Sequence, residues 1–429
     1  MSSSTITLVS VFAVLLMAIK KSHQDIASKR MILLFTGYWG IVLTLSTLGL
    51  YGMNKPTSYV LLLLVTNVVM FTLGYSVIKT GNVAVNYTFN DTKSLMESII
   101  KNRFFTALLI VSTLVSIIAF QTFQSFVQSG WSLSEIRTGY FEGGFYGDIG
   151  ILFPVLLTPM EYICIPLFGY MLVYKRNWKF ILVAVFLLTY TSLGAGRFGY
   201  VRIAVGILFI SYCMMGSKSI RLNKLFLPIL GIVGLVFIIS MVTSLRSGGN
   251  KIDSESTIKS FTNYAVGSIP AFNYAVQNNY EEKIGGYQYG RLTLSSVEGL
   301  SYSLLGRFGI QTEKALDKLI PLKQNNQIDI GTGTWNALYT AVLYFYLDGG
   351  LLGCIIIPFL LGIGFRYTIR LLYTYRSWPM MILVSMFFQM ALHSVSDYSF
   401  YHPFTLIYVV ILLYIGLRFF VKFRGEQIK

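Results

Sequence analysis

The sequence predicts an all-α protein, built as a polytopic bundle of about eleven transmembrane helices. Of its 429 residues, 54% are hydrophobic and only 12% are charged, whereas about 25% of residues in soluble domains are charged. Runs of about twenty residues without a charged side chain recur along the chain, and a helix of that length crosses the roughly 30 Å hydrocarbon core of a bilayer. Clear cases are residues 57–78, 104–123 and 225–245.

The apolar segments, in chain order, are residues 5–19, 31–51, 57–78, 104–123, 149–173, 179–195, 198–215, 225–245, 350–373, 379–396 and 403–421. The first has no basic segment before it and no small-residue cleavage site after it, so we expect a retained span rather than a signal peptide. Residues 335–347 are also apolar, but they end at Asp348-Gly349-Gly350. A run of about thirteen residues suits a re-entrant helix, or the outer part of one long tilted helix, better than a separate crossing.

Lysine and arginine residues are concentrated in alternate connections between these segments. The second connection carries Lys55 alone, whereas the first carries Lys20, Lys21, Lys29 and Arg30. The positive-inside rule places the basic connections in the cytoplasm. We therefore expect the N-terminus outside and the C-terminus inside. The regions would be residues 1–245 with eight spans, a large outer polar region at 246–334, and residues 335–429 with the half helix and three spans.

The outer polar region is predicted to contain short amphipathic helices. Residues 291–305 carry apolar side chains at helical spacing, namely Leu292, Val297, Leu300, Leu304 and Leu305. Such a pattern is typical of a helix that lies on a membrane surface. Residues 311–320 are a second short candidate.

Several classes of function are disfavoured by the residues. Each cysteine, Cys164, Cys213 and Cys354, lies in a separate apolar segment, which fits neither a disulfide framework nor a metal site. The net charge of +16 is divided among the connections and forms no basic face, so a nucleic-acid partner is not expected. No Asp-x-Asp, HExxH or P-loop signature is present, so we expect no metal, no other cofactor and no ATPase activity.

Two arginines are predicted to hold a phosphate-bearing lipid at the outer face. Arg197 lies in the short glycine-rich turn between two spans, and Arg246 closes the next span on the same side. Arginine suits this role because its planar guanidinium donates two hydrogen bonds to one phosphate. The alternatives stay open: Arg197 would anchor the turn, and Arg246 would reach the interface as arginines at span ends do.

Further candidates for substrate binding lie in other outer connections. Arg291 and Arg307 are flanked by glycine and aromatic residues, and Arg137 lies at the possible start of an outer helix. Tyr287 and Tyr289, close to Arg291, are suited to stacking on sugar rings, and ordinary packing is the alternative. For the three arginines, a solvated position in a loop is the alternative.

Four titratable residues are candidates for proton transfer. His393 and His402 flank an outer turn that contains Asp397, and histidine is the usual acid–base group at neutral pH. A structural role in the turn is the alternative for both histidines. Asp348, at the membrane edge, is a second candidate base. Glu161 lies midway along an apolar segment, where a carboxylate is either protonated or paired; it is either a relay or gating group or a structural hydrogen-bond partner.

Three segments of the chain resemble the bacterial oligosaccharide repeat-unit polymerases, the O-antigen polymerase family. The first is Gly194-Ala195-Gly196-Arg197, which is similar to a glycine-and-arginine turn between two mid-chain spans. The second, from Tyr264 to Phe272, is similar to the opening of a large periplasmic loop. The third runs from Thr332 to Gly353 and includes an Asp-Phe-Gly-x-x-Gly pattern, in which Gly349 replaces the aromatic residue. The resemblance covers roughly residues 100–420.

The resemblance implies a glycosyltransferase-C-like helical fold, shared with O-antigen ligases, in the bacterial inner membrane with the active site facing the periplasm. It also implies a reaction on undecaprenyl-diphosphate-linked oligosaccharides, in which the growing glycan moves to the non-reducing end of a new lipid-linked repeat unit. Arg197, Arg246 and Arg291 would then stabilise the departing diphosphate. His393 or Asp348 would act on the acceptor hydroxyl.

Besides lipid-linked sugars and the bilayer, a polysaccharide chain-length regulator is a candidate partner. An O-antigen ligase and a flippase of lipid-linked oligosaccharides are the alternatives to a polymerase.

Overall fold

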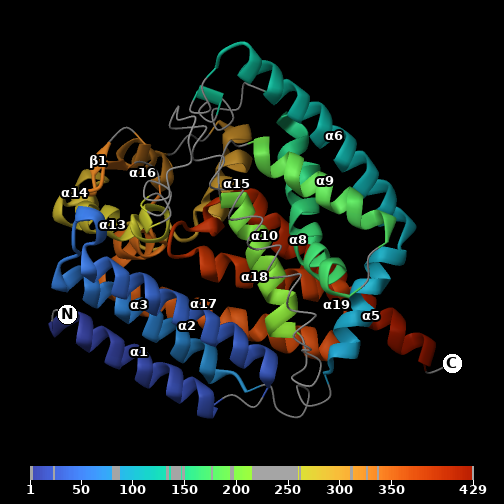
Figure 1. Cartoon of the computed structure of the whole chain (residues 1–429), viewed down its shortest axis with the longest axis horizontal. Coiled ribbons are helices and arrows are strands. Elements are labelled where there is room, and N and C mark those ends of the chain that lie inside the picture. Colours follow the sequence, from blue (N-terminus) through green and yellow to red (C-terminus); the bar gives the residue numbers. More distant parts are fainter. Residues whose placement is uncertain are drawn as a thin grey trace. The chain divides into compact units, whose positions relative to one another are not determined.

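The structure is a computed structural model of the chain, and it describes residues 3–22, 25–79, 87–131, 135–136, 146, 150–174, 177–193, 198–214, 259, 262–309, 313–324, 327–335 and 338–427. Most of these residues are helical (Figure 1). Within these ranges the one sheet is a two-stranded antiparallel ribbon that pairs β1 (Ile328–Asp329) with β2 (Thr334–Trp335). The predicted all-α fold class is therefore confirmed.

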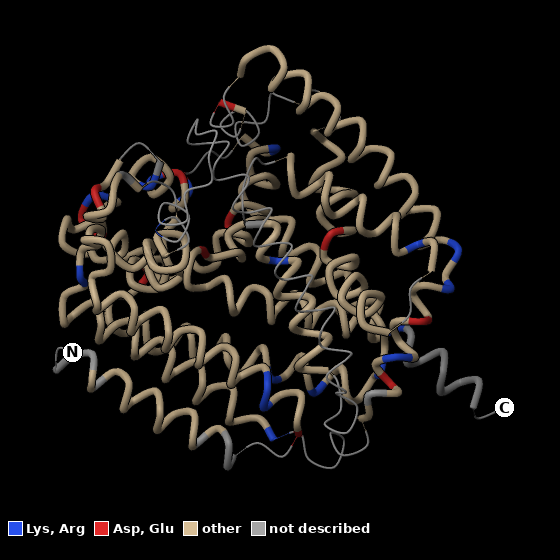
Figure 2. Tube along the Cα trace, in the orientation of Figure 1, with Lys and Arg blue, Asp and Glu red and all other residues tan. Residues whose placement is uncertain are grey.

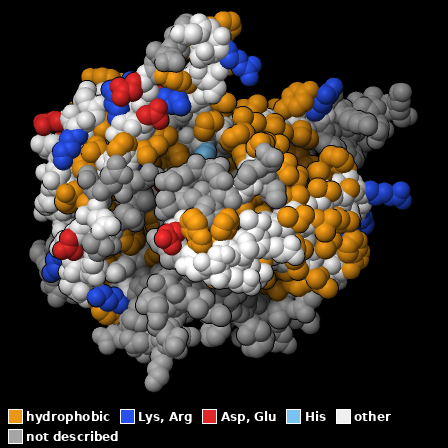
Figure 3. Space-filling view, turned by 90° about the horizontal axis from the view of Figure 1, so that it is seen from above, with side chains coloured by type: hydrophobic (Ala, Val, Ile, Leu, Met, Phe, Trp, Pro, Cys, Tyr) orange, Lys and Arg blue, Asp and Glu red, His pale blue; other side chains and the backbone are white. Residues whose placement is uncertain are grey.

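Five of the described helical segments are long and apolar enough to cross a membrane: α2 (Ile26–Leu48), α3 (Ser58–Val77), α6 (Arg103–Gln128), the joined η3 (Phe153–Leu157) and α8 (Thr158–Val173), and α17 (Val342–Tyr375). Figure 2 shows that charged residues lie mostly at helix ends and in connections, and Figure 3 shows hydrophobic side chains covering a wide area of one face. Both features are typical of helices that lie in hydrocarbon. The chain is a membrane protein.

The other described elements are shorter apolar helices, surface helices and single turns. They are α1 (Ser3–Ser22), η1 (Leu50–Gly52), α5 (Phe89–Lys101), α9 (Trp178–Leu193), α10 (Phe198–Leu208), η4 (Phe209–Met214), α13 (Ser268–Gln277), α14 (Tyr280–Lys283), α15 (Ser295–Leu305), η5 (Gly306–Phe308), α16 (Ala315–Gln324), α18 (Trp378–His393), η6 (Ser399–Tyr401) and α19 (Pro403–Gln427).

The chain divides into two compact units. Unit 1 draws on Met1–Ala84, Ile258–Leu371 and Met390–Tyr414, and unit 2 on Val85–Thr257, Leu372–Gln389 and Ile415–Lys429.

In unit 1, α1 and α2 pack along each other, and α3 and α17 meet backbone to backbone. A Cβ atom at Gly74 of α3 would run into the Phe359 carbonyl of α17, and one at Gly362 of α17 would run into the Phe71 carbonyl of α3. Membrane helices approach this closely where small residues line the interface, because van der Waals packing replaces the hydrophobic driving force available in water.

A buried ion pair closes one end of unit 1. Arg366 of α17 donates through Nη2 to the Asp25 carboxylate at 2.9 Å and through Nε to the Ile78 carbonyl at 3.2 Å. The guanidinium also lies 5.3 Å from the Tyr75 ring centroid. Asp25 is the N-cap of α2, and Ile78 follows the last residue of α3. Arg366 therefore ties together two connections that the sequence assigns to the same side of the membrane.

Replacing Arg366 with alanine is expected to destabilise unit 1 strongly, because the buried Asp25 carboxylate would lose the guanidinium that binds its Oδ2. Breaking a buried pair from one side costs about 3–5 kcal/mol. The matched control is Arg376→Ala, which removes the half-exposed pair with Asp91 at 3.1 Å and should cost under about 1 kcal/mol. Thermal unfolding in detergent measures both. Equal losses of stability for the two variants would contradict the structural role of Arg366.

The opposite end of unit 1 is built from the polar region. The backbone N–H of Asn54 donates to the Ile330 carbonyl at 2.8 Å, and the backbone N–H of Thr57 donates to the Asn273 side chain at 2.8 Å. The connection between α2 and α3 is therefore held by residues of the predicted outer region.

In unit 2, α6 packs along α9, and α8 packs against α10 with glycines at the contact. A Cβ atom at Gly169 would lie 3.0 Å from the Gly206 carbonyl oxygen. Glu161, which the sequence shows as an isolated carboxylate, forms an ion pair with Arg202 of α10, and the Glu161 side chain is buried. The Arg202 guanidinium also lies 5.5 Å from the Tyr162 ring centroid. Glu161 is therefore a paired group inside unit 2.

Candidate functional site

The candidate site begins at a break in α17. Gly349 has φ −167° and ψ 26°, and Gly350 has φ 59° and ψ −136°. A residue with a side chain would be strained at Gly350, where a Cβ would also lie 2.9 Å from the Tyr287 hydroxyl. A Cβ at Gly353 would run into the Phe345 carbonyl, although residues eight apart in a straight helix are separated by about 12 Å. Residues 342–348 therefore form a short buried arm that is bent back on the helix that follows.

The break frees backbone carbonyls, and a loop of the polar region binds them. The Gln288 N–H donates to the Leu347 carbonyl, and the Tyr289 N–H donates to the Asp348 carbonyl, each at 2.9 Å. Non-helical backbone at membrane depth requires such partners, because no water is available to it there. We call residues 287–293 the Arg291 loop.

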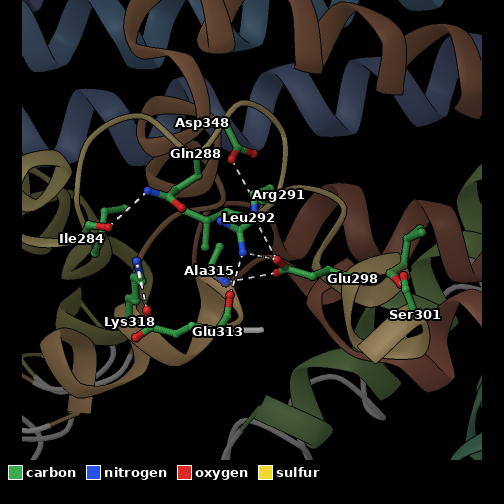
Figure 4. A network of polar contacts seen from close by, with 11 residues as sticks. Ile284, Gln288, Arg291, Leu292, Glu298, Ser301, Glu313, Ala315, Lys318 and Asp348 are labelled. Atoms are coloured by element: carbon green, nitrogen blue, oxygen red, sulfur yellow. Dashed lines mark hydrogen bonds and ion pairs between the residues drawn. The ribbon is translucent and has the colours of Figure 1, made fainter. Parts of the chain in front are cut away.

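The Asp348 carboxylate fixes the far end of the Arg291 loop. Its Oδ1 accepts from the Leu292 N–H at 3.0 Å (Figure 4), and its Oδ2 accepts from the Thr293 N–H at 2.7 Å. The Asp348 residue is only 3% exposed. Both oxygens are thus occupied by backbone donors. Asp348 therefore holds the loop in place. It is poorly placed to act as the predicted base, because a base needs a carboxylate oxygen that is open to the substrate.

Arg291 is held in place by an acidic partner and yet stays open to solvent. Its Nε and Nη2 donate to Oε1 of Glu298 at 2.8 and 2.6 Å, and Nη2 also donates to the Glu313 carbonyl at 2.7 Å. Glu298 in turn accepts from the Ala315 N–H at 3.1 Å. Figure 4 shows the Arg291 and Glu298 side chains meeting backbone groups at the start of α16. The Arg291 side chain remains 46% exposed, so a ligand can reach it.

Two tyrosines of the Arg291 loop face outward. Tyr289 is 87% exposed and has a φ of 51°, a left-handed conformation that is unusual for a tyrosine. Tyr287 is 42% exposed, and its ring packs edge-on against Tyr346 at 6.4 Å between centroids. These exposed rings beside Arg291 form a surface suited to sugar and phosphate contact.

A second cluster, built around a buried lysine, adjoins the same loop. Lys323 of α16 donates to the Tyr344 hydroxyl at 2.8 Å, and its ammonium lies 5.0 Å from the Tyr344 ring centroid and 5.8 Å from that of Tyr339. The Tyr344 ring packs on Tyr398 at 5.1 Å, and the Tyr398 hydroxyl donates to the Thr293 carbonyl at 2.8 Å. We call Lys323, Tyr344, Tyr398, Asp397 and His402 the Lys323 cluster.

The acidic member of the Lys323 cluster is the half-buried Asp397. Removal from water raises the pKa of Asp397 above its ordinary value, while the positive charge of Lys323 acts in the opposite direction. Burial lowers the pKa of Lys323, and the Asp397 charge opposes that change. The ring of His402, an exposed residue, packs against Tyr401 at 5.0 Å. The Lys323 cluster therefore extends from the buried ammonium group of Lys323 to the exposed imidazole of His402.

The structure brings together some of the residues that the sequence singled out. Asp348, Arg291, Tyr287 and Tyr289 lie in or on one loop. Arg307, in η5, is exposed, and His393 is buried at the end of α18. Outside the described residues lie three of the predicted arginines, Arg137, Arg197 and Arg246.

Lys323 was missed by the sequence analysis. It lies in a short polar segment next to Leu322 and close to Pro321, and no local pattern marks that lysine as buried. Its burial depends on Tyr339 and Tyr344, which are remote in sequence.

Comparison with known protein families, characterised proteins and solved structures finds no match to this chain.

Proposed function

We propose that this membrane protein is a glycosyltransferase that polymerises lipid-linked oligosaccharide repeat units at the outer face of a bacterial inner membrane. The observation that carries the proposal is the structural role of the Asp348-Gly349-Gly350-x-x-Gly353 pattern. Asp348 anchors the Arg291 loop, and Gly350 adopts the positive φ at which α17 is interrupted. Gly353 has no Cβ and so leaves space for the Phe345 carbonyl of the bent arm. A pattern that carries the family resemblance thus coincides with the built site.

The predicted eleven-span topology is part of the proposal, and the contacts within each unit support it. In unit 1, Arg366 joins two connections predicted to be cytoplasmic, whereas Asn54 joins a predicted outer connection to the polar region. In unit 2, the predicted cytoplasmic residues Arg376 and Asp91 form an ion pair. Connections assigned to one side by their basic residues therefore contact one another within each unit.

The proposed reaction transfers the growing glycan from undecaprenyl diphosphate to a hydroxyl of the new repeat unit. The hydroxyl oxygen attacks the anomeric carbon, the bond to the diphosphate oxygen breaks with its electron pair, and the hydroxyl proton passes to a base. Asp397 suits the base better than Asp348, because backbone donors occupy both Asp348 oxygens. Arg291 would stabilise the charge on the departing diphosphate, and Arg197 and Arg246, which the sequence predicts for the same role, lie outside the described residues.

This assignment predicts a specific pH dependence. The rate should fall as the pH drops through the raised pKa of Asp397, because the protonated carboxyl accepts no proton. Lys323→Met should shift this fall in rate, the acidic limb of the pH–rate profile, to higher pH, since the charge of Lys323 lowers the pKa of Asp397. Lys318→Met, on the same helix but paired with Glu313, should leave the limb in place. An unchanged pH–rate profile in Lys323→Met would remove Asp397 from the proposed role.

A deletion test in cells separates the proposal from the two alternatives. Loss of a polymerase leaves surface lipid that carries a single repeat unit. Loss of a flippase, which the buried Glu161–Arg202 pair would suit because transporters place polar groups inside the bundle, leaves no repeat unit on the surface. Loss of an O-antigen ligase leaves polymer on the undecaprenyl carrier. Either of the last two outcomes would overturn the proposal.

A further inference from the structure

An exposed apolar stripe runs along α15 and η5. Its members are Leu294, Val297, Leu304, Leu305 and Phe308, which are 57%, 44%, 60%, 40% and 80% exposed. Successive members are separated by three, seven, one and three residues, and Ser301 fills the gap in the middle. This spacing places all of them on one helical face.

The opposite face of α15 is packed against other parts of unit 1. Ser295 and Ser296 are buried, and a Cβ at Gly299 would lie 2.9 Å from the Pro403 side chain. Glu298 binds Arg291 at the flank of the helix. These contacts set the orientation of α15, and the stripe lies on the face that is turned away from them.

Two observations indicate which kind of partner suits the stripe. Pro403, against which Gly299 packs, is the first residue of the apolar helix α19, so α15 lies level with the end of an apolar helix. The stripe contains no acidic residue, and the charged residue within its final turn is the exposed Arg307. A face that is apolar with a basic edge, placed where apolar helices end, is complementary to the surface of a phospholipid bilayer.

We propose that the stripe on α15 and η5 is seated in the outer leaflet of the bilayer, with Arg307 at the lipid phosphates. The contact with lipid rests on the exposure and packing of α15 and η5, and its assignment to the outer leaflet rests on the topology proposed above. This contact with the membrane also positions the Arg291 loop. Glu298 is carried by the same helix, so the membrane seat holds the Arg291 loop at the boundary between lipid and water.

Single nitroxide labels measure directly whether the stripe lies in lipid or in water. The three native cysteines are buried, so a label attached to one introduced cysteine reports one position. Phe308→Cys and Leu304→Cys place the label on the stripe, and Ser303→Cys places it on the other side of the same helix, at an exposed residue. The full-length protein is reconstituted in nanodiscs that contain phosphatidylglycerol, and collision with oxygen is compared with collision with a water-soluble nickel chelate.

The seat predicts that labels at residues 304 and 308 collide more with oxygen, and that the label at residue 303 collides more with the nickel chelate. Adding Leu304→Asp to Phe308→Cys should move the residue-308 label toward the nickel chelate. Equal nickel access at residues 303 and 308 would overturn the proposal. Dipolar broadening between labels at residue 308, which indicates a second copy of the chain on the stripe, would overturn it too.

Discussion

Replacing Asp348 with alanine is expected to abolish polymer formation while the protein still accumulates in the membrane. The change removes both acceptors of the Leu292 and Thr293 N–H groups. A hydrogen bond to a charged group contributes about 1.5–3 kcal/mol, and an unsatisfied buried donor adds a desolvation cost. The Arg291 loop would then lose its anchor at one end, and Arg291 and the exposed tyrosines would lose their positions.

Two readouts check the Asp348 prediction. Glycan length on gels measures the activity, and amide hydrogen exchange over residues 287–294 measures the loop. Asp348→Asn keeps one carbonyl acceptor and should show an intermediate exchange rate. Asp329→Ala is the matched control, since Asp329 also accepts a backbone N–H, from Gly331 at 2.7 Å, but in an exposed turn. Wild-type exchange in Asp348→Ala would show that the carboxylate does not hold the loop.

Replacing Gly362 with leucine is expected to cause a large loss of stability in unit 1. The new side chain would begin at the Phe71 carbonyl, in a contact where the α3 and α17 backbones already touch. Overpacking a close contact typically costs about 1–3 kcal/mol, and more where backbone must move. The same helix supplies a control in Gly364→Leu, because nothing lies within 4 Å of a Cβ at Gly364.

Thermal unfolding in detergent compares the two glycine variants. Gly362→Leu should unfold at a clearly lower temperature than the wild type, and Gly364→Leu should unfold close to it. If both variants match the wild type, α3 and α17 do not pack through these glycines.

The fold class was predictable because the absence of charge over about twenty residues is a strong local signal. Asp348-Gly349-Gly350 also indicated a break in the chain, although the helix before the break begins at Val342 and not at residue 335. The pairing of Arg366 with Asp25 could not be predicted from the sequence, because the two residues are 341 positions apart. Arg202 is a similar case. Its place near an outer turn gave no indication that it pairs with Glu161 of another helix.

The site was only partly predictable. The sequence treats 291–305 as one amphipathic helix with Leu292 on its apolar face, whereas the structure begins α15 at Ser295 and buries Leu292. The reason is Asp348, which binds the backbone at Leu292 and Thr293 and holds those residues in the loop. Asp348 itself was identified from its position at the membrane edge. Its use as an anchor depends on a contact that spans more than fifty positions.

The most direct test of the proposed function is a reaction with purified components. The protein in nanodiscs is incubated with one defined undecaprenyl-diphosphate-linked repeat unit, without nucleotide sugar and without added metal. The account predicts a ladder of glycans, each longer than the last by one repeat unit, that is absent in Asp348→Ala. A substrate that remains a single repeat unit with correctly folded wild-type protein would contradict the account.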